Sequence, residues 1–100
     1  MQFSIPADHP SLPGHFPGRP VVPGVVVLDQ VLQALAQQGW VEGALRLPQV
    51  KFLQPLLPDQ SAEILLEHGP VAGQGPWRFQ VTSEGRTIAT GRIENAQASA

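Results

Sequence analysis

Two residues that could exchange protons, His15 and Asp29, lie in one proline-rich to apolar stretch, GHFPGRPVVPGVVVLDQVLQ, at residues 14–33. An imidazole titrates near neutral pH and is the usual general base of enzymes, and a carboxyl group can serve as the matching acid. Simpler roles fit equally well. A loop histidine can make a structural hydrogen bond, and an aspartate early in a helix is stabilised by the helix dipole.

The segment that carries the histidine is predicted to be a stiff loop. Pro17, Pro20 and Pro23 stand at three-residue intervals, and residues 6–24 contain six prolines and three glycines. Proline fixes φ and biases the preceding residue towards extended backbone. The same prolines form two overlapping PxxP patterns, typical of peptide ligands of SH3-type domains. Direct fusion to a helix, with no linker, disfavours that interpretation.

The segment that carries the aspartate is predicted to be a helix from Gly24 or Val25 to about Gln38. Its apolar stripe follows helical spacing at Leu28, Val31, Leu32 and Leu35, and Gly39 supplies the stop. Asp29 is expected at the border of this stripe, where a carboxylate loses hydration unless it finds a partner.

Gly24 is a third candidate. A glycine at a helix N-terminus lets a substrate approach the free backbone N–H groups, which can polarise a carbonyl. A turn glycine after Pro23 is the simpler alternative. His9, His15 and His68 have no metal-binding spacing and the chain has no cysteine, so no metal site is expected. No serine has the context of a nucleophile elbow.

The composition indicates one domain over residues 1–100. Hydrophobic residues make up 42% and charged residues 14%, below the roughly 25% charge of ordinary domains, which favours an oligomer interface. The net charge of −2 argues against nucleic acid as a partner. The absence of cysteine, of a signal peptide and of a long apolar run predicts a cytoplasmic protein that does not span a membrane.

The rest of the chain alternates like antiparallel strands. A short strand is expected at residues 2–5 before the long loop, and four more follow the helix at residues 44–53, 61–68, 77–83 and 86–94. Pro48 indicates an edge strand or a bulge, and Glu84-Gly85 indicates a tight turn. One helix with a mostly antiparallel sheet predicts an α+β domain.

Residues 14–33 resemble the active-site motif of the FabA/FabZ family of 3-hydroxyacyl-[acyl-carrier-protein] dehydratases. That motif reads G-H-F-P-x-x-P-x-x-P-G, then a few apolar residues, an acid, and a glutamine four residues later. A second block, VKFLQPLLPDQ at residues 50–60, is similar to the family's K-F-x-x-P-V-x-P-G-D segment. The resemblance implies a hot-dog fold, in which a curved antiparallel sheet wraps one long helix, and a dimer whose sites combine the histidine of one subunit with the acid of the other.

The resemblance also implies roles. His15 would remove the α-proton of a 3-hydroxyacyl thioester, and Asp29 of a second subunit would protonate or orient the departing hydroxyl. The Gly24 amide would bind the thioester carbonyl, and Gln33 would position the acid. No cofactor is needed, because the thioester itself acidifies the α-carbon. The remaining expected substrate contacts are Phe16, Pro23 and Val25.

The implied reaction converts 3-hydroxyacyl-acyl-carrier-protein to the trans-2-enoyl thioester, with acyl carrier protein as partner and a homodimer, or a heterodimer, as the assembly. Asp29 follows the FabA branch, whereas the rest of the motif is closer to FabZ. The short segment before the first strand suggests a specialised member, in fatty-acid, aryl-polyene or polyketide-like biosynthesis. Two alternatives stay open: a hot-dog acyl thioesterase and a non-catalytic acyl-binding subunit.

Overall fold

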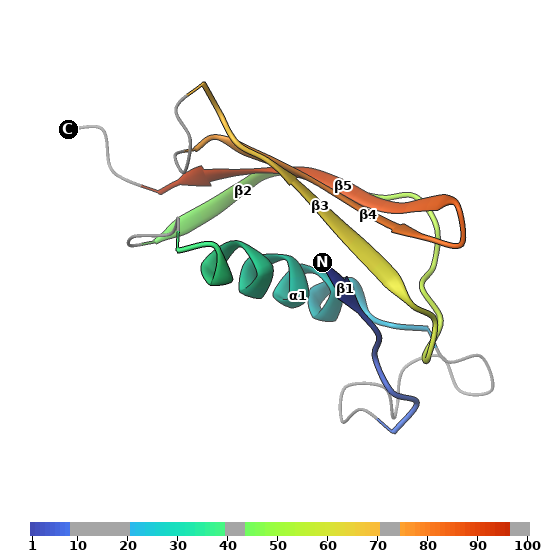
Figure 1. Cartoon of the computed structure of the whole chain (residues 1–100). Coiled ribbons are helices and arrows are strands. Elements are labelled where there is room, and N and C mark those ends of the chain that lie inside the picture. The colour runs from blue at the N-terminus through green and yellow to red at the C-terminus, as the bar shows by residue number, and fades with distance from the viewer. Residues whose placement is uncertain (9–20, 40–43, 71–74, 97–100) are drawn as a thin grey trace.

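The computed structural model describes residues 1–8, 21–39, 44–70 and 75–96. Within these ranges one helix, α1 (Gly24–Gln37), lies along one face of a twisted antiparallel sheet (Figure 1). The strand order is β1-β3-β4-β5-β2. The strands are β1 (Gln2–Phe3), β2 (Leu45–Phe52), β3 (Ala62–Glu67), β4 (Trp77–Ser83) and β5 (Arg86–Asn95). The α+β prediction is confirmed, and each predicted strand is present: β4 has the predicted ends, and the ends of the other strands differ by one or two residues.

Helix α1 packs on the sheet through a stripe that contains Val31 and Leu35, as predicted, but otherwise differs from the predicted one. Val27, Val31 and Leu35 are at most 2% exposed, at a strict four-residue spacing. Leu28 and Leu32, which the pattern placed in the buried stripe, are only partly buried against the core. The sequence offers apolar residues over more than half of the helix surface, so periodicity did not fix which side faces the sheet. Gly39, with φ of +73°, ends the helix as predicted.

The strongest alternation in the sequence, in β4, produces the centre of the core. Trp77, Phe79 and Val81 are buried on the side of the sheet that faces α1, while Arg78 and Gln80 lie on the other side. A two-residue turn with positive φ at Glu84 and Gly85 joins β4 to β5, as the turn signal predicted.

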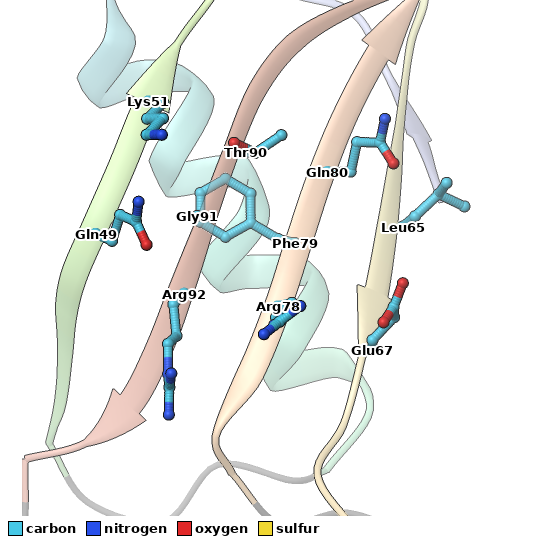
Figure 2. A pocket seen from close by; sticks show the side chains of 10 residues that line it. All are labelled: Gln49, Lys51, Leu65, Glu67, Arg78, Phe79, Gln80, Thr90, Gly91 and Arg92. Atoms are coloured by element: carbon cyan, nitrogen blue, oxygen red, sulfur yellow. The ribbon is translucent and has the colours of Figure 1, made fainter.

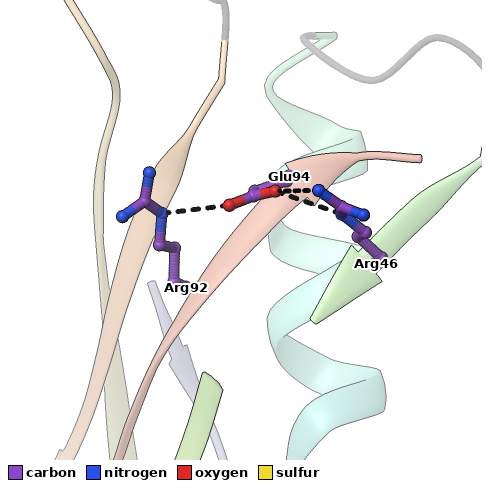
Figure 3. Close-up of polar contacts among 3 residues, drawn as sticks. All are labelled: Arg46, Arg92 and Glu94. Carbon is purple, nitrogen blue, oxygen red and sulfur yellow. Dashed lines mark hydrogen bonds and ion pairs between the residues drawn. The ribbon is translucent and has the colours of Figure 1, made fainter. Parts of the chain in front are cut away.

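Strand β2 is an edge strand and carries the predicted irregularity. Its register against β5 shifts between Arg46 and Gln49, on either side of Pro48. Near this end of the strand Arg46 donates to Glu94 Oε2 from both Nε (3.1 Å) and Nη2 (2.8 Å), and Arg92 Nε lies 3.4 Å from Glu94 Oε1 (Figure 3). Exposed ion pairs contribute only about 0–1 kcal/mol, so this cluster adds little to the stability of the fold.

The face of the sheet turned away from α1 is mostly polar. A shallow hollow of about 400 Å³ lies there, and Figure 2 shows its side chains with α1 behind the strands. Leu65, on β3, lines this hollow with a large apolar side chain that is 49% exposed. Because this hollow is separated from α1 by the sheet, it cannot include the helix N-terminus. No helix in the described ranges is long and apolar enough to cross a membrane.

Candidate active site

The site begins where Pro23 leads into α1. The Pro23 carbonyl accepts hydrogen bonds from the amides of Val26 (3.0 Å) and Val27 (3.3 Å), so it closes the first turn. Within the described residues no side chain caps this end, and the first turn holds no acidic residue. The first amides of a helix have no intrahelical acceptor and carry the positive end of the helix dipole. This end of α1 is therefore suited to bind an oxygen that carries negative charge.

The chain segment that follows β2 links the start of the helix to the sheet. The Val22 amide donates to the Leu56 carbonyl at 2.8 Å, which joins the approach to α1 to the segment after β2. That segment is in turn joined to β5, because the amides of Leu53 (2.8 Å) and Gln54 (3.3 Å) donate to the Ile88 carbonyl. The helix start is thus fixed relative to the sheet by backbone hydrogen bonds.

A mostly apolar cavity of about 420 Å³ opens at this point. Its floor consists of the buried side chains of Val27, Leu56 and Ile88, each at most 2% exposed. Phe52 and Leu53 line it while remaining about half exposed, at 51% and 53%. The full lining is Val21, Val22, Pro23, Gly24, Val27, Phe52, Leu53, Gln54, Pro55, Leu56 and Ile88. The predicted site residues Pro23 and Gly24 therefore border a space that suits a hydrocarbon chain.

The Phe52 ring packs directly against Gly24 at the edge of this cavity. A methyl group at Gly24 would come within 2.7 Å of Phe52 Cζ and 3.0 Å of both Cε atoms. Only glycine leaves room for the ring at this distance. The sequence had assigned no role to Phe52, although it stands in the second family-like block. Strand alternation, which puts Phe52 and Val50 on the same side of β2, is the sequence signal that could have indicated that Phe52 faces the helix.

The predicted acid lies farther along the helix. Gln33 Nε2 donates to Asp29 Oδ2 at 2.7 Å, across one helical turn, and both side chains are exposed. The prediction that Asp29 lies at the border of the buried stripe is wrong for the single chain. Val25, one turn before Asp29, is 72% exposed, so Val25, Asp29 and Gln33 form an outer ridge of α1.

The structure brings together part of the predicted site. Pro23 and Gly24 meet at the cavity, and Asp29 meets Gln33 on the ridge. Gly24 and Asp29 are separated by about 7.5 Å of rise along the helix axis. His15 and Phe16 lie outside the described residues, so their placement beside Gly24 or Asp29 stays a prediction.

Comparison with known proteins gives the family. Residues 1–92 match the family model described as ApeI-like, ApeI dehydratase. The chain is 32% identical over 101 residues to the 3-hydroxyacyl-[acyl-carrier-protein] dehydratase FabZ of Anaeromyxobacter sp., covering 86% of this chain and 63% of that protein. It is 30% identical to the FabZ of Thermus thermophilus, covering 87% of this chain and 70% of that protein. The chain thus spans less than two thirds of the Anaeromyxobacter protein.

Solved structures agree with these matches. The dehydratase heterocomplex ApeI:P from Xenorhabdus doucetiae contains a chain with a TM-score of 0.69 and 26% identity, covering 93% of this chain and 81% of that one. An uncharacterised protein from Erwinia carotovora subsp. atroseptica gives a TM-score of 0.71 and 29% identity, covering 93% and 77%. The α+β fold with one central helix is therefore the hot-dog fold, and the chain belongs to the ApeI-like family of FabZ-like hot-dog dehydratases.

Proposed function

We propose that this protein dehydrates 3-hydroxyacyl thioesters carried on acyl carrier protein to trans-2-enoyl thioesters. The observation that carries the proposal is the apolar cavity that opens on Gly24 at the start of α1. A thioester carbonyl bound by the amides there would leave its acyl chain in an apolar space. The family match supplies the reaction class, and the cavity supplies a place for the substrate.

In the proposed step the His15 imidazole removes the α-proton of the thioester. The electron pair of that C–H bond forms the new double bond, and the hydroxyl leaves the β-carbon with a proton from Asp29 as water. The amides at Gly24 stabilise the negative charge that develops on the carbonyl oxygen meanwhile. Gln33 holds the Asp29 carboxyl group in one orientation, and Phe16, Pro23 and Val25 contribute substrate contacts. The proton that His15 has gained then returns to Asp29 through water, so the pair is restored and protons and electrons balance without any cofactor.

The proposal includes a second subunit. Asp29 lies on the exposed ridge of α1 in a single chain, so it is available to a site completed by another chain. In the described residues β2 pairs on one side only, with β5, and its other edge can extend a sheet. We propose a homodimer with shared sites. A heterodimer is the alternative, since a relative is a member of a dehydratase heterocomplex.

The substrate class in this proposal is the 3-hydroxyacyl chain of fatty-acid, aryl-polyene or polyketide-like biosynthesis, and the location is the cytoplasm. Acyl carrier protein is the proposed partner because the curated relatives are named for acyl-carrier-protein substrates. The described part of the chain contributes the cavity for the acyl group, and the carrier would remain outside it.

The test is a product assay on the protein purified with any subunit that accompanies it. With 3-hydroxyacyl thioesters on acyl carrier protein, mass spectrometry should show loss of water from the acyl group and no free thiol. His15→Ala should abolish this, whereas His68→Ala, just after β3, should not. Release of a free thiol would establish a thioesterase instead, and an unchanged substrate would establish a non-catalytic subunit.

A further inference from the structure

We propose that Phe52 determines which acyl chains the site accepts, by limiting the bulk allowed at the carbon atoms next to the thioester. This inference rests on the proposed function and deepens it. Phe52 would be a specificity-determining residue, distinct from the proton-transferring pair.

The strand places the Phe52 ring on the side of the sheet that faces α1. Phe52 is the last residue of β2, and its partner in the β5 register is Ala89, which is fully buried. Opposite residues of an antiparallel pair project their side chains to the same face. Lys51, one residue earlier, pairs with Thr90 and projects to the polar outer face.

The ring points its far edge at Gly24. The three atoms nearest to a methyl group built on Gly24 are all at the tip of the ring, Cζ, Cε1 and Cε2. A carbonyl oxygen bound by the first amides of α1 would therefore have the ring as a neighbour. The α- and β-carbons of the acyl chain follow the carbonyl directly, so they would be the atoms that contact Phe52.

Phe52, unlike the residues of the cavity floor, can vary without cost to the core. Val27, Leu56 and Ile88 are buried and form part of the hydrophobic core. Phe52 is 51% exposed, and the hydrogen bonds of Leu53 and Gln54 to the Ile88 carbonyl hold the backbone just after it. A smaller side chain at this position would widen the space in front of Gly24 and leave the fold intact.

The experiment compares two substrates that differ in bulk at the β-carbon: a linear 3-hydroxyhexanoyl thioester and a 3-hydroxy-3-phenylpropanoyl thioester. The measured quantity is the ratio of their kcat/KM values. Phe52→Ala should shift this ratio towards the phenyl substrate by about tenfold or more, and Phe52→Leu by less, as expected for pocket contacts. Leu65→Ala is the matched control, because Leu65 is equally exposed but lies on the outer face.

The outcomes separate this inference from the proposed function. If the wild-type protein dehydrates and both Phe52 variants keep its ratio, the inference is overturned and the proposed function stands. If the wild-type protein does not dehydrate either substrate, the proposed function fails. The inference is then decided by binding of two unreactive thioether analogues, hexyl and phenylpropyl pantetheine: a changed preference in Phe52→Ala supports it, and an unchanged one overturns it. Circular dichroism and thermal melting verify that each variant is folded.

Discussion

Gln33 holds the carboxyl group of Asp29 through a 2.7 Å hydrogen bond from its side-chain amide, across one turn of α1. Both side chains are exposed in the single chain, so neighbouring residues do not restrict them as a core would. The hydrogen bond is therefore the described contact that selects one orientation of the Asp29 carboxyl group. In the proposed reaction this orientation decides whether a proton can reach the leaving hydroxyl.

Replacing Gln33 should impair turnover more than substrate binding. We expect Gln33→Ala to lower kcat by roughly tenfold with little change in KM, because a misdirected acid slows proton transfer without removing a substrate contact. Gln33→Glu should be worse, since it places two carboxylates one turn apart on the same ridge. Steady-state kinetics on a 3-hydroxyacyl thioester give the two constants.

The control for this prediction is Gln37→Ala, one turn farther along the same ridge, where the side chain is also exposed. It should behave as wild type. Full activity in Gln33→Ala would show that the hydrogen bond is not used in the reaction.

Subunit mixing tests whether His15 and Asp29 act across two chains. His15→Ala and Asp29→Asn should each lower kcat by about 10²- to 10⁴-fold, the usual contribution of a general acid or base. After the two inactive variants are mixed and allowed to exchange subunits, a shared site should recover roughly a quarter of wild-type activity, because half of the dimers then hold one intact site.

A control mixture contains two batches of the same variant, for which no recovery is expected. Glu63→Gln, an exposed carboxylate on β3, controls for the loss of one negative charge and should remain active. If each variant is inactive but the mixture stays inactive after confirmed exchange, the two residues do not combine across two copies of this chain.

A methyl group at Gly24 should disturb the site without unfolding the helix. Alanine is intrinsically more favourable than glycine in a helix by about 1 kcal/mol, so Gly24→Ala should fold. The new methyl group would force the Phe52 ring into the cavity, and kcat/KM for a linear substrate should fall by about tenfold or more.

The double variant Gly24→Ala/Phe52→Ala removes the displaced ring and should recover part of this loss. Gly24→Ala/Leu65→Ala should not, because Leu65 lies on the outer face of the sheet. Equal activity of Gly24→Ala and its combination with Phe52→Ala would show that ring displacement is not the cause.

Strand β5 approaches its neighbours closely at Gly91. We expect a side chain at this position to lower the stability of the fold without affecting the site. A methyl group at Gly91 would overlap the Phe79 ring and lie 2.7 Å from the Gln49 carbonyl oxygen. Figure 2 shows the Phe79 ring beside Gly91. The Gln49 carbonyl belongs to the strand backbone, so it cannot move aside easily. Gly91→Ala should lower the free energy of unfolding by about 1–3 kcal/mol, measured by denaturant titration.

Thr90→Ala, on the neighbouring residue of the same strand, is the matched control and should change the free energy of unfolding by no more than about 0.5 kcal/mol. A Gly91→Ala protein as stable as wild type would mean that the three strands can separate locally to admit a methyl group.

Local patterns in the sequence were sufficient to predict the elements and the family. Four predictions came from local signals: the alternation in β4, the irregularity at the proline in β2, the Glu84-Gly85 turn and the helix end at the glycine after α1. The structure contains each predicted feature, because each depends on residues that are neighbours in the sequence. The motif in residues 14–33 gave the family, since glycines, prolines and acid–base residues at fixed intervals rarely coincide by chance. It named His15 and Phe16, whose positions lie outside the described residues.

Long-range packing, which local patterns do not contain, sets which side of α1 is buried and which residue faces Gly24. Apolar residues surround much of this helix, so the choice of Val27, Val31 and Leu35 over Leu28 and Leu32 follows from the shape of the sheet. That choice turned Asp29 outwards. The contact between Phe52 and Gly24 joins the end of β2 to the start of α1, and depends on the register of β2 against β5. Such long-range register is set by the packing of the whole sheet, which no local pattern in the sequence contains.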